Sequence, residues 1–290
     1  MASATSPRSR LAAFRGVATY LLLLFGATAC QYNEEKVLAL PDEDGSLPAR
    51  VTASAETAPV ASRGDAADDP VVLVAGDQAW IAASDKQFGL RVYELSGREI
   101  LALDFGRLNN VDAVPHGPGT YLMAASNRTT LSIDLFSVEL GDDIDVQPAY
   151  SIPLDFEDPY GICMGSLNDG ISVFVGDKTG RVQWWDVTSA SGAMRREIRF
   201  DSQTEGCVVD AESRTLFVGE EETGIWAVDL DSGDRSLIDQ VGAGRLTADV
   251  EGLDIYRTED SRYLIASSQG DNSFAVYELP AGEPITRFRI

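Results

Sequence analysis

Histidine and cysteine are scarce in this chain of 290 residues. His116 is the only histidine, and the cysteines are Cys30, Cys163 and Cys207. Zinc sites are built mainly from histidine and cysteine ligands, and no cysteine pair here has the spacing that they require. A histidine nucleophile needs neighbours that orient and activate it, whereas His116 lies in His-Gly-Pro-Gly, a turn sequence. Zinc sites and phosphoryl transfer through a histidine are therefore excluded.

Positive charge is also in short supply. The chain has 23 Lys and Arg against 46 Asp and Glu, which gives a net charge of −23. Because phosphate backbones would be repelled, a general nucleic-acid binder is excluded. An acidic protein can still bind an anion when metal ions mediate the contact. The composition, 44% apolar and 24% charged, is that of a globular protein.

Long apolar runs are absent except near the N-terminus, where one indicates export. Three arginines precede the apolar residues 16–29, which are fewer than the roughly 20 that a spanning helix needs. The run ends in Ala27-Thr28-Ala29-Cys30, which is similar to the lipobox of bacterial lipoproteins. We predict a signal peptide over residues 1–30 and favour lipidation of Cys30 over ordinary cleavage after Ala29. The mature protein would be an outer-membrane or periplasmic lipoprotein, or otherwise periplasmic or secreted.

Residues 31–64 are rich in Ala, Glu, Asp, Pro and Ser and show no sustained period. They lack the apolar surface to pack, so we predict a flexible linker followed by a folded domain over residues 65–290. Cys163 and Cys207 lie in apolar runs at similar positions of consecutive repeats. An oxidising compartment would permit a disulfide between them, but we favour buried free thiols.

A repeated unit organises this domain. Strand-like runs ending in a small residue are followed at once by polar residues, and the small residues recur at intervals of 42, 50, 43 and 48. Periods of about 40 to 50 residues are typical of propeller blades. Each unit contains several short runs of β-branched and aromatic residues bounded by Gly, Asp and Ser. The second residue after the small residue should project onto the same surface in every unit. These residues are Lys86, Arg128, Lys178, Glu221 and Gln269.

A further short strand precedes each of these positions. These strands hold Asp69, Tyr160, Glu205 and Glu251 at matched positions and should line a central channel. No long segment after the signal has a helical apolar stripe, so helix content should be low. A sixth inner strand does not follow before Ile290. We therefore predict an all-β protein, a six-bladed β-propeller that is incomplete, with about five blades present.

Two sets of charged groups should share one face of this propeller. Clustered carboxylates repel one another unless cations lie among them, and oxygen-only donors select hard ions such as Ca²⁺. Lys and Arg beside metal-bound oxygens are suited to phosphate, since Arg offers a planar fork and Lys a compact charge. A bound cation also acidifies water into a nucleophile. The acidic set is Asp68, Asp69, Glu205, Glu221, Asp249 and Glu251, with oxygens of Tyr160 and Gln269 in support, and the basic set is Lys86, Arg128 and Lys178.

Several motifs resemble those of one enzyme family. They lie in residues 65–70, 106–112, 124–128, 159–161, 202–207, 246–253 and 266–273 and include Pro159-Tyr160-Gly161 and Thr204-Glu205-Gly206-Cys207. Together they resemble the β-propeller phytases, calcium-dependent six-bladed enzymes that remove phosphates from inositol hexakisphosphate (phytate). The resemblance runs from about Asp65 to Ile290.

The resemblance implies a role for each residue of the site. Positions matching the family's ligands for several Ca²⁺ ions are Asp68, Asp69, Glu205, Glu221, Asp249, Glu251 and Gln269. Positions matching its phosphate and catalytic site are Lys86, Arg128, Tyr160 and Lys178, together with Glu221. The implied reaction is that of a 3-phytase, in which a calcium-activated water attacks phosphorus in calcium-phytate. We expect a monomer that contacts no nucleic acid and meets a membrane only through a lipid on Cys30.

Two departures from the family pattern accompany this resemblance. Val72-Leu73 stands where the family usually has Ile-Trp, which should be a packing change. The family's last blade, with further acidic ligands, has no counterpart after Ile290. If the 290-residue chain is complete in the cell, we expect it to bind calcium weakly and turn over slowly.

Two other functions remain open from the sequence. One is a non-catalytic periplasmic propeller that binds a partner. The other is a calcium-dependent propeller hydrolase of another class, such as a lactonase. That second reading needs a catalytic histidine or a different ligand set near the channel, and His116 is poorly placed for it.

Overall fold

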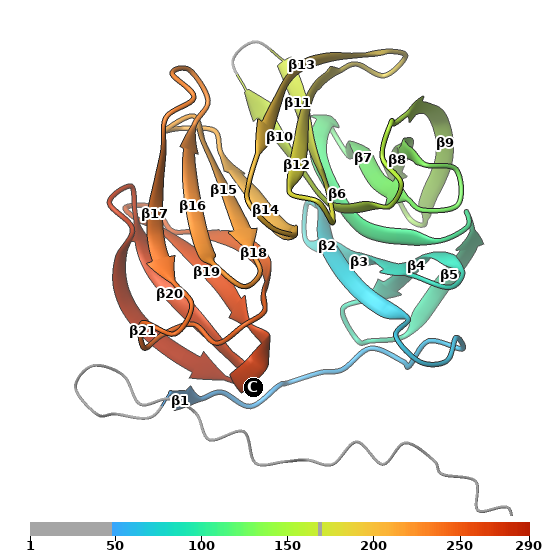
Figure 1. The fold of residues 1–290 in the computed structure, drawn as a ribbon. Coiled ribbons are helices and arrows are strands. Elements are labelled where there is room, and N and C mark those ends of the chain that lie inside the picture. The colour runs from blue at the N-terminus through green and yellow to red at the C-terminus, as the bar shows by residue number, and fades with distance from the viewer. Residues whose placement is uncertain (1–47, 168–169) are drawn as a thin grey trace, which may run out of the picture. The chain divides into compact units, whose positions relative to one another are not determined.

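The computed structural model describes residues 48–167 and 170–290 (Figure 1). The predicted signal peptide, Cys30 and the first part of the linker lie outside these residues. Within them the chain is all β apart from one 3₁₀ helix, η1 (Gln269–Asp271). No helix in the described part of the chain is long and apolar enough to cross a membrane.

Five sheets follow one another along the chain, and each contains four strands consecutive in sequence, to which the fifth sheet adds β1. Blade 1 comprises β2 (Ala67–Ala75), β3 (Gln78–Asp85), β4 (Gly89–Glu94) and β5 (Glu99–Asp104). Blade 2 comprises β6 (Leu108–Gly117), β7 (Thr120–Asn127), β8 (Ser132–Leu140) and β9 (Ile144–Pro153). Blade 3 comprises β10 (Pro159–Leu167), β11 (Gly170–Asp177), β12 (Arg181–Val187) and β13 (Gly192–Arg199). Blade 4 comprises β14 (Thr204–Asp210), β15 (Thr215–Glu220), β16 (Gly224–Asp229) and β17 (Arg235–Gln240). Blade 5 comprises β18 (Val250–Arg257), β19 (Arg262–Ser268), β20 (Ser273–Leu279) and β21 (Glu283–Arg289).

The first strand of each blade is the inner strand. β2 packs against β6, β6 against β10, β10 against β14, and β14 against β18, so the inner strands form a continuous series (Figure 1). Within each blade the four strands pair antiparallel in sequence order, as in a propeller. The predicted all-β fold with five blades is confirmed.

Apolar side chains fill the space between consecutive blades. Four separate clusters of buried residues lie between blades 1 and 2, 2 and 3, 3 and 4, and 4 and 5. In the first cluster Leu73 of β2 and Met123 of β7 are both fully buried. Burying a side chain of this size contributes about 2 kcal/mol. Apolar residues of the predicted strands therefore also hold neighbouring blades together.

The outward faces of the first and last blades expose apolar side chains that other blades bury. Val72 of β2 is 55% exposed, whereas Met164 and Val209 at the equivalent positions of blades 3 and 4 are 5% and 6% exposed. Tyr256 of β18 is 60% exposed, whereas its equivalent in blade 1, Leu73, is fully buried. These faces lack the neighbouring blade that covers the corresponding residues elsewhere.

Every inner strand carries a β-bulge at the same place. The pairing register shifts between Ala67 and Pro70, Leu108 and Val111, Pro159 and Ile162, Thr204 and Cys207, and Val250 and Leu253. A bulge inserts an unpaired residue and re-aims the side chains beside it. Equivalent positions of the blades can therefore be assigned from the register.

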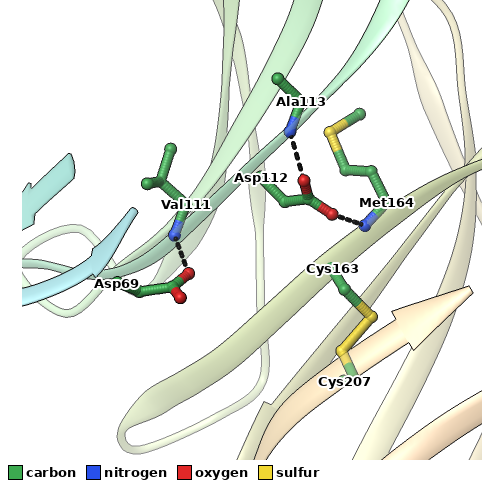
Figure 2. Close-up of a disulfide and its surroundings, with 7 residues drawn as sticks. All are labelled: Asp69, Val111, Asp112, Ala113, Cys163, Met164 and Cys207. Carbon is green, nitrogen blue, oxygen red and sulfur yellow. Dashed lines mark hydrogen bonds between the residues drawn. A yellow bond between two sulfur atoms is a disulfide. The ribbon is translucent and has the colours of Figure 1, made fainter. Parts of the chain in front are cut away.

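The register explains a disulfide that the sequence analysis did not favour. Cys163 and Cys207 are joined in a disulfide, so the prediction of free thiols was wrong (Figure 2). Cys207 is equivalent to Ile162, the residue before Cys163. Because side chains alternate along a strand, this offset of one residue turns Cys163 towards blade 4 and Cys207 towards blade 3. The bridge links inner strands β10 and β14.

Buried carboxylates also link consecutive inner strands. Asp69 Oδ2 accepts a hydrogen bond from Val111 N at 3.1 Å, and Asp112 Oδ2 accepts one from Met164 N at 2.7 Å (Figure 2). Burial raises the pKa of Asp112 to about 7, with a smaller contribution from the charge of Asp254. The inner strands of blades 1 to 3 are thus joined by side-chain to backbone bonds as well as by packing.

Part of the segment predicted to be a flexible linker is hydrogen-bonded to the propeller. β1 (Ala49–Arg50) pairs in parallel with β21, as a fifth strand of that sheet. Further along, Ala58 N donates to Gly97 O at 2.7 Å, and Ser62 Oγ donates to Asp85 Oδ2 at 2.7 Å. Residues 49–62 therefore contact both the last and the first blade, although most of their side chains are exposed.

Candidate active site

The bulges place one side chain from each inner strand in an equivalent position. We call these residues the inner set: Asp68, Asn109, Tyr160, Glu205 and Glu251. The sequence analysis matched Asp69, rather than Asp68, to Tyr160, and the register shows that this match was wrong by one residue. Asp69 is equivalent to Asn110 and Gly161, and its carboxylate is directed to Val111 in blade 2. The role predicted for Asp69 as a ligand stays a prediction.

The first residue after the second strand of each blade forms an outer set: Lys86, Arg128, Lys178, Glu221 and Gln269. In four of these the backbone N–H makes the same kind of bond, to the carbonyl of a residue just before the inner strand. The bonds are Lys86 N to Ala66 O, Arg128 N to Arg107 O, Glu221 N to Gln203 O, and Gln269 N to Asp249 O. The predicted equivalence of these positions is reflected in the backbone itself.

Short turns fix the three basic members of the outer set. Asp85, Asn127 and Asp177 end the second strands of blades 1 to 3, and each Oδ1 accepts the N–H two residues further on. Such Asx turns are favoured because the short side chain replaces a backbone carbonyl. The basic residue lies between the residue that accepts this bond and the residue that donates it in each of the three turns. The local sequence therefore fixes the turn in which each of Lys86, Arg128 and Lys178 lies.

Inner and outer residues of the same blade meet in four blades. Lys86 Nζ lies 3.1 Å from Asp68 Oδ1, and Arg128 Nη1 donates to Asn109 Oδ1 at 3.2 Å. Lys178 Nζ lies 4.5 Å from the centre of the Tyr160 ring. In blade 5 the two residues are amide and carboxylate: Gln269 Nε2 donates to Glu251 Oε1 at 2.8 Å. Two sets predicted from separate patterns thus form one site.

Contacts between blades draw the inner set together. Asn109 Nδ2 of blade 2 donates to Glu205 Oε1 of blade 4 at 3.0 Å, and the Tyr160 hydroxyl hydrogen-bonds with the Glu205 carboxylate. Glycine allows this close approach, because a Cβ at Gly161 would lie 1.8 Å from Glu205 O. A Cβ at Gly206 would lie 1.6 Å from Glu251 O. Glu205 is consequently the residue on which three blades converge.

The carboxyl groups of the site are harder to ionise than ordinary carboxyl groups. The pKa of Glu205 is raised to about 8, first by burial and then by the charges of Asp68 and Glu251. Burial, with Asp68 and Glu221 next in size, raises the pKa of Glu251 to about 7. The pKa values of Asp68 and Glu221 are also raised, in both cases mainly by burial. A cation would favour the ionised form of every one of these groups.

The donor set fits a hard divalent cation. Asp68 Oδ2 is buried and has no hydrogen-bond partner in the described chain, which is costly unless an ion or water completes it. Asp249 supplies a further carboxylate whose charge raises the pKa of Glu221 and Glu251. Among residues 48–167 and 170–290, no three His, Cys, Asp or Glu side chains stand in ready-made ligand geometry. The oxygens would therefore have to draw closer around an ion, as flexible oxygen ligands do around Ca²⁺.

The sequence analysis missed several residues of the site. Asn109 is fully buried and Gln203 Nε2 donates to Glu221 Oε1 at 2.6 Å. Asp65 lies 2.9 Å from Lys86 Nζ. Asp158 binds Arg128 through both its oxygens, at 2.5 Å to Nε and 2.7 Å to Nη2. Asn109 could have been found only from the bulge register, while Asp65 and Asp158 lie in connections outside the repeated strands.

His116 is not part of the site. It is exposed and lies next to the last residue of β6, whereas Asn109 is the second residue of that strand. Seven residues of extended chain, at about 3.3 Å each, span more than 20 Å. A propeller hydrolase that uses a histidine near the channel is thus not supported.

Comparisons with known proteins agree with this arrangement. The sequence matches the profile of the phytase family over residues 17–290. It is 34% identical over 253 residues to the 3-phytase of Bacillus subtilis (strain 168), in a match that covers 79% of this chain and 66% of that protein. The chain in a crystal structure of a nidogen/laminin complex has the same fold, with a TM-score of 0.56, 12% identity and coverage of 77% of this chain and 80% of that one. Together with the predicted motifs, these findings show that the chain belongs to the phytase family.

Proposed function

We propose that this protein hydrolyses phosphate monoesters of phytate in a calcium-dependent reaction, as a 3-phytase. The observation that carries the proposal is that three basic outer residues, Lys86, Arg128 and Lys178, each contact the inner residue of their own blade. The same inner set also holds the carboxyl groups of Asp68, Glu205 and Glu251. The relative from Bacillus subtilis supports the substrate, because it is named a 3-phytase. The match spans 66% of that relative, so the activity of this chain has to be tested directly.

The basic residues would bind phosphate, and the acidic residues with Gln269 would bind calcium. Arg128 presents a planar fork that suits two oxygens of one phosphate, and Lys86 and Lys178 present compact charges. Ca²⁺ ions would be held by Asp68, Asp69, Glu205, Glu221, Asp249, Glu251 and Gln269. When bound, they would neutralise phosphate oxygens and lower the pKa of water. A cation–π contact with the face of the Tyr160 ring holds the Lys178 ammonium group beside the site.

The reaction needs no nucleophile from the protein. A water oxygen forms a bond to phosphorus, the bond from phosphorus to the inositol oxygen breaks, and that oxygen takes up a proton. The products are inorganic phosphate and an inositol with one phosphate fewer. The basic residues hold the reacting phosphate in line and stabilise charge on its oxygens. Tyr160 holds the Glu205 carboxylate in place through its hydroxyl.

Phosphate release from phytate, with calcium and with chelator, tests the proposal. We expect release with calcium, none with chelator, and at least a hundredfold lower kcat/KM in Arg128→Ala and Lys178→Ala. Arg98→Ala is the matched control, because the Arg98 side chain is 67% exposed and pairs with nearby Glu94. A wild-type protein that binds calcium but releases no phosphate would leave the non-catalytic binding propeller as the better explanation.

We further propose that the protein is exported as a lipoprotein through Cys30 and acts as a monomer. The basis is the N-terminal sequence, which lies outside the described residues. Mass spectrometry of the mature N-terminus distinguishes a lipidated Cys30 from a chain cleaved after Ala29. Size-exclusion chromatography with light scattering gives the oligomeric state.

A further inference from the structure

Asp158 occupies the anion-binding groups of the proposed site. Its carboxylate engages Arg128 through two hydrogen bonds, Nε to Oδ1 at 2.5 Å and Nη2 to Oδ2 at 2.7 Å. Asp158 Oδ2 also lies 3.6 Å from Lys178 Nζ. The same carboxylate therefore bridges two of the three basic residues of the outer set.

This bridge uses the groups that a phosphate would need. The Nε and Nη2 donors of a guanidinium form a two-pronged site, and a bidentate carboxylate binds there in the same geometry as a phosphate. Arg128 Nη1 is also engaged, by Asn109 Oδ1 at 3.2 Å. The fork on the Nε side of Arg128 is therefore open to a ligand only when the Asp158 carboxylate moves away.

The position of Asp158 allows such a movement. Its side chain is 33% exposed, and it lies between β9 and β10 rather than within a strand. Arg128 is more enclosed, with its side chain 16% exposed, and its backbone is fixed at the end of β7. Of the two partners, the carboxylate is the one free to swing towards solvent.

We infer that Asp158 is a specificity-determining residue that competes with substrate phosphate for Arg128 and Lys178. This inference rests on the function proposed above. One carboxylate brings a single negative charge to two cations, so a phosphate monoester dianion balances them better. Asp158 thus lowers the affinity of the site for every anion, and only anions with more negative charge than a carboxylate displace it.

Two other roles for Asp158 make different predictions. A calcium ligand would lose calcium affinity when its charge is removed. A purely structural ion pair would lose stability without any change in anion binding. The competition described here predicts tighter anion binding when the carboxylate charge is removed and the shape is kept.

Asp158→Asn is the decisive variant, because the amide keeps the size of the side chain and an acceptor oxygen. Asp155→Asn is the matched control in the same connection: Asp155 pairs with Arg181 at 2.8 Å, and its side chain is 70% exposed. Inorganic phosphate is the probe, measured as a competitive inhibitor of phytate hydrolysis in the presence of calcium. Calorimetric titration of phosphate into the calcium-loaded protein gives the same affinity without turnover.

We expect the inhibition constant of phosphate to fall about tenfold in Asp158→Asn, which corresponds to about 1.4 kcal/mol, and to change less than twofold in Asp155→Asn. Calcium affinity should change less than threefold. Unchanged or weaker phosphate binding in a folded Asp158→Asn protein would overturn the inference, as would a tenfold loss of calcium affinity. If the wild-type protein released no phosphate from phytate, the proposed function would fail, and calorimetry would still decide whether Asp158 competes with the anion.

Discussion

The raised pKa of Glu205 predicts how stability depends on pH when calcium is removed. Glu205 is 8% exposed, and the pKa of its carboxyl group is raised to about 8 from an ordinary value of 4.5. At about 1.4 kcal/mol for each unit, ionising it in the folded protein costs up to about 5 kcal/mol. Between these two pKa values the folded state keeps a proton that the unfolded state has lost. The free energy of unfolding should therefore fall as pH rises from about 5 to 8.

Other carboxyl groups of the site act in the same direction over this range. The pKa of Glu251 is raised to about 7, and those of Asp68 and Glu221 are also raised. Carboxyl groups with lowered pKa values, such as that of Glu220, contribute stability that is lost only at more acidic pH. Between pH 5 and 8 the slope is therefore determined by the site together with the buried Asp112, whose pKa is raised to about 7. Calcium should stabilise more at pH 8 than at pH 5, because it binds the ionised carboxylates and releases their protons.

Urea denaturation at pH 5 and pH 8, with chelator and with calcium, measures these effects. In chelator at pH 8, Glu205→Gln should be more stable than the wild type by several kcal/mol, and its dependence on pH should be flatter. With calcium the order should reverse, because the variant loses a ligand. Glu259→Gln, an exposed control, should follow the wild type. A wild-type protein that becomes more stable between pH 5 and 8 in chelator would refute the reasoning, and so would a Glu205→Gln protein no more stable than the wild type at pH 8.

Two further predictions concern the links between blades. Thiol titration of the unfolded, unreduced protein should find Cys163 and Cys207 unreactive. Replacing both cysteines by Ser should lower the free energy of unfolding by about 4 kcal/mol, because a disulfide across a sequence separation of 44 removes about that much chain entropy from the unfolded state. A loss below 1 kcal/mol would mean that packing alone holds the two strands. Gly161→Ala places a Cβ 1.8 Å from Glu205 O and should lower the free energy of unfolding, measured by urea denaturation, by at least about 3 kcal/mol. The control is Gly252→Ala, whose Cβ would have no atom within 4 Å and which should lower it by less than about 1 kcal/mol. Equal effects at the two glycines would contradict the close approach of β10 and β14.

Features that follow from local patterns could be predicted from the sequence. Strands were predicted from runs of β-branched and aromatic residues bounded by Gly, Asp and Ser, and the structure has several strands in each repeated unit. The repeat interval correctly indicated five blades. Lys86, Arg128, Lys178, Glu221 and Gln269 were recognised as equivalent because each follows a strand end of the same kind.

Features that depend on register or on contacts between loops could not be predicted in this way. A β-bulge adds one residue to a strand, and a shift of one residue turns a side chain to the opposite face. The bulge places Asp68 rather than Asp69 in the inner set. A difference of one residue in strand position turns Cys163 and Cys207 towards each other. The amino-terminal segment that pairs with β21 was also missed, because its composition contains no apolar pattern.

The sequence by itself determined the fold class, the number of blades and the residue types gathered at one end of the strands. The strands and the residues that follow them depend on neighbours within a few residues, and the number of blades follows from how often that local pattern recurs. Tertiary structure decided which groups face one another: the disulfide, Asn109 against Glu205, and Asp158 against Arg128. These partners are separated by 44, 96 and 30 residues. They meet only because packed blades bring their inner strands and connections together, and no local pattern records such a contact.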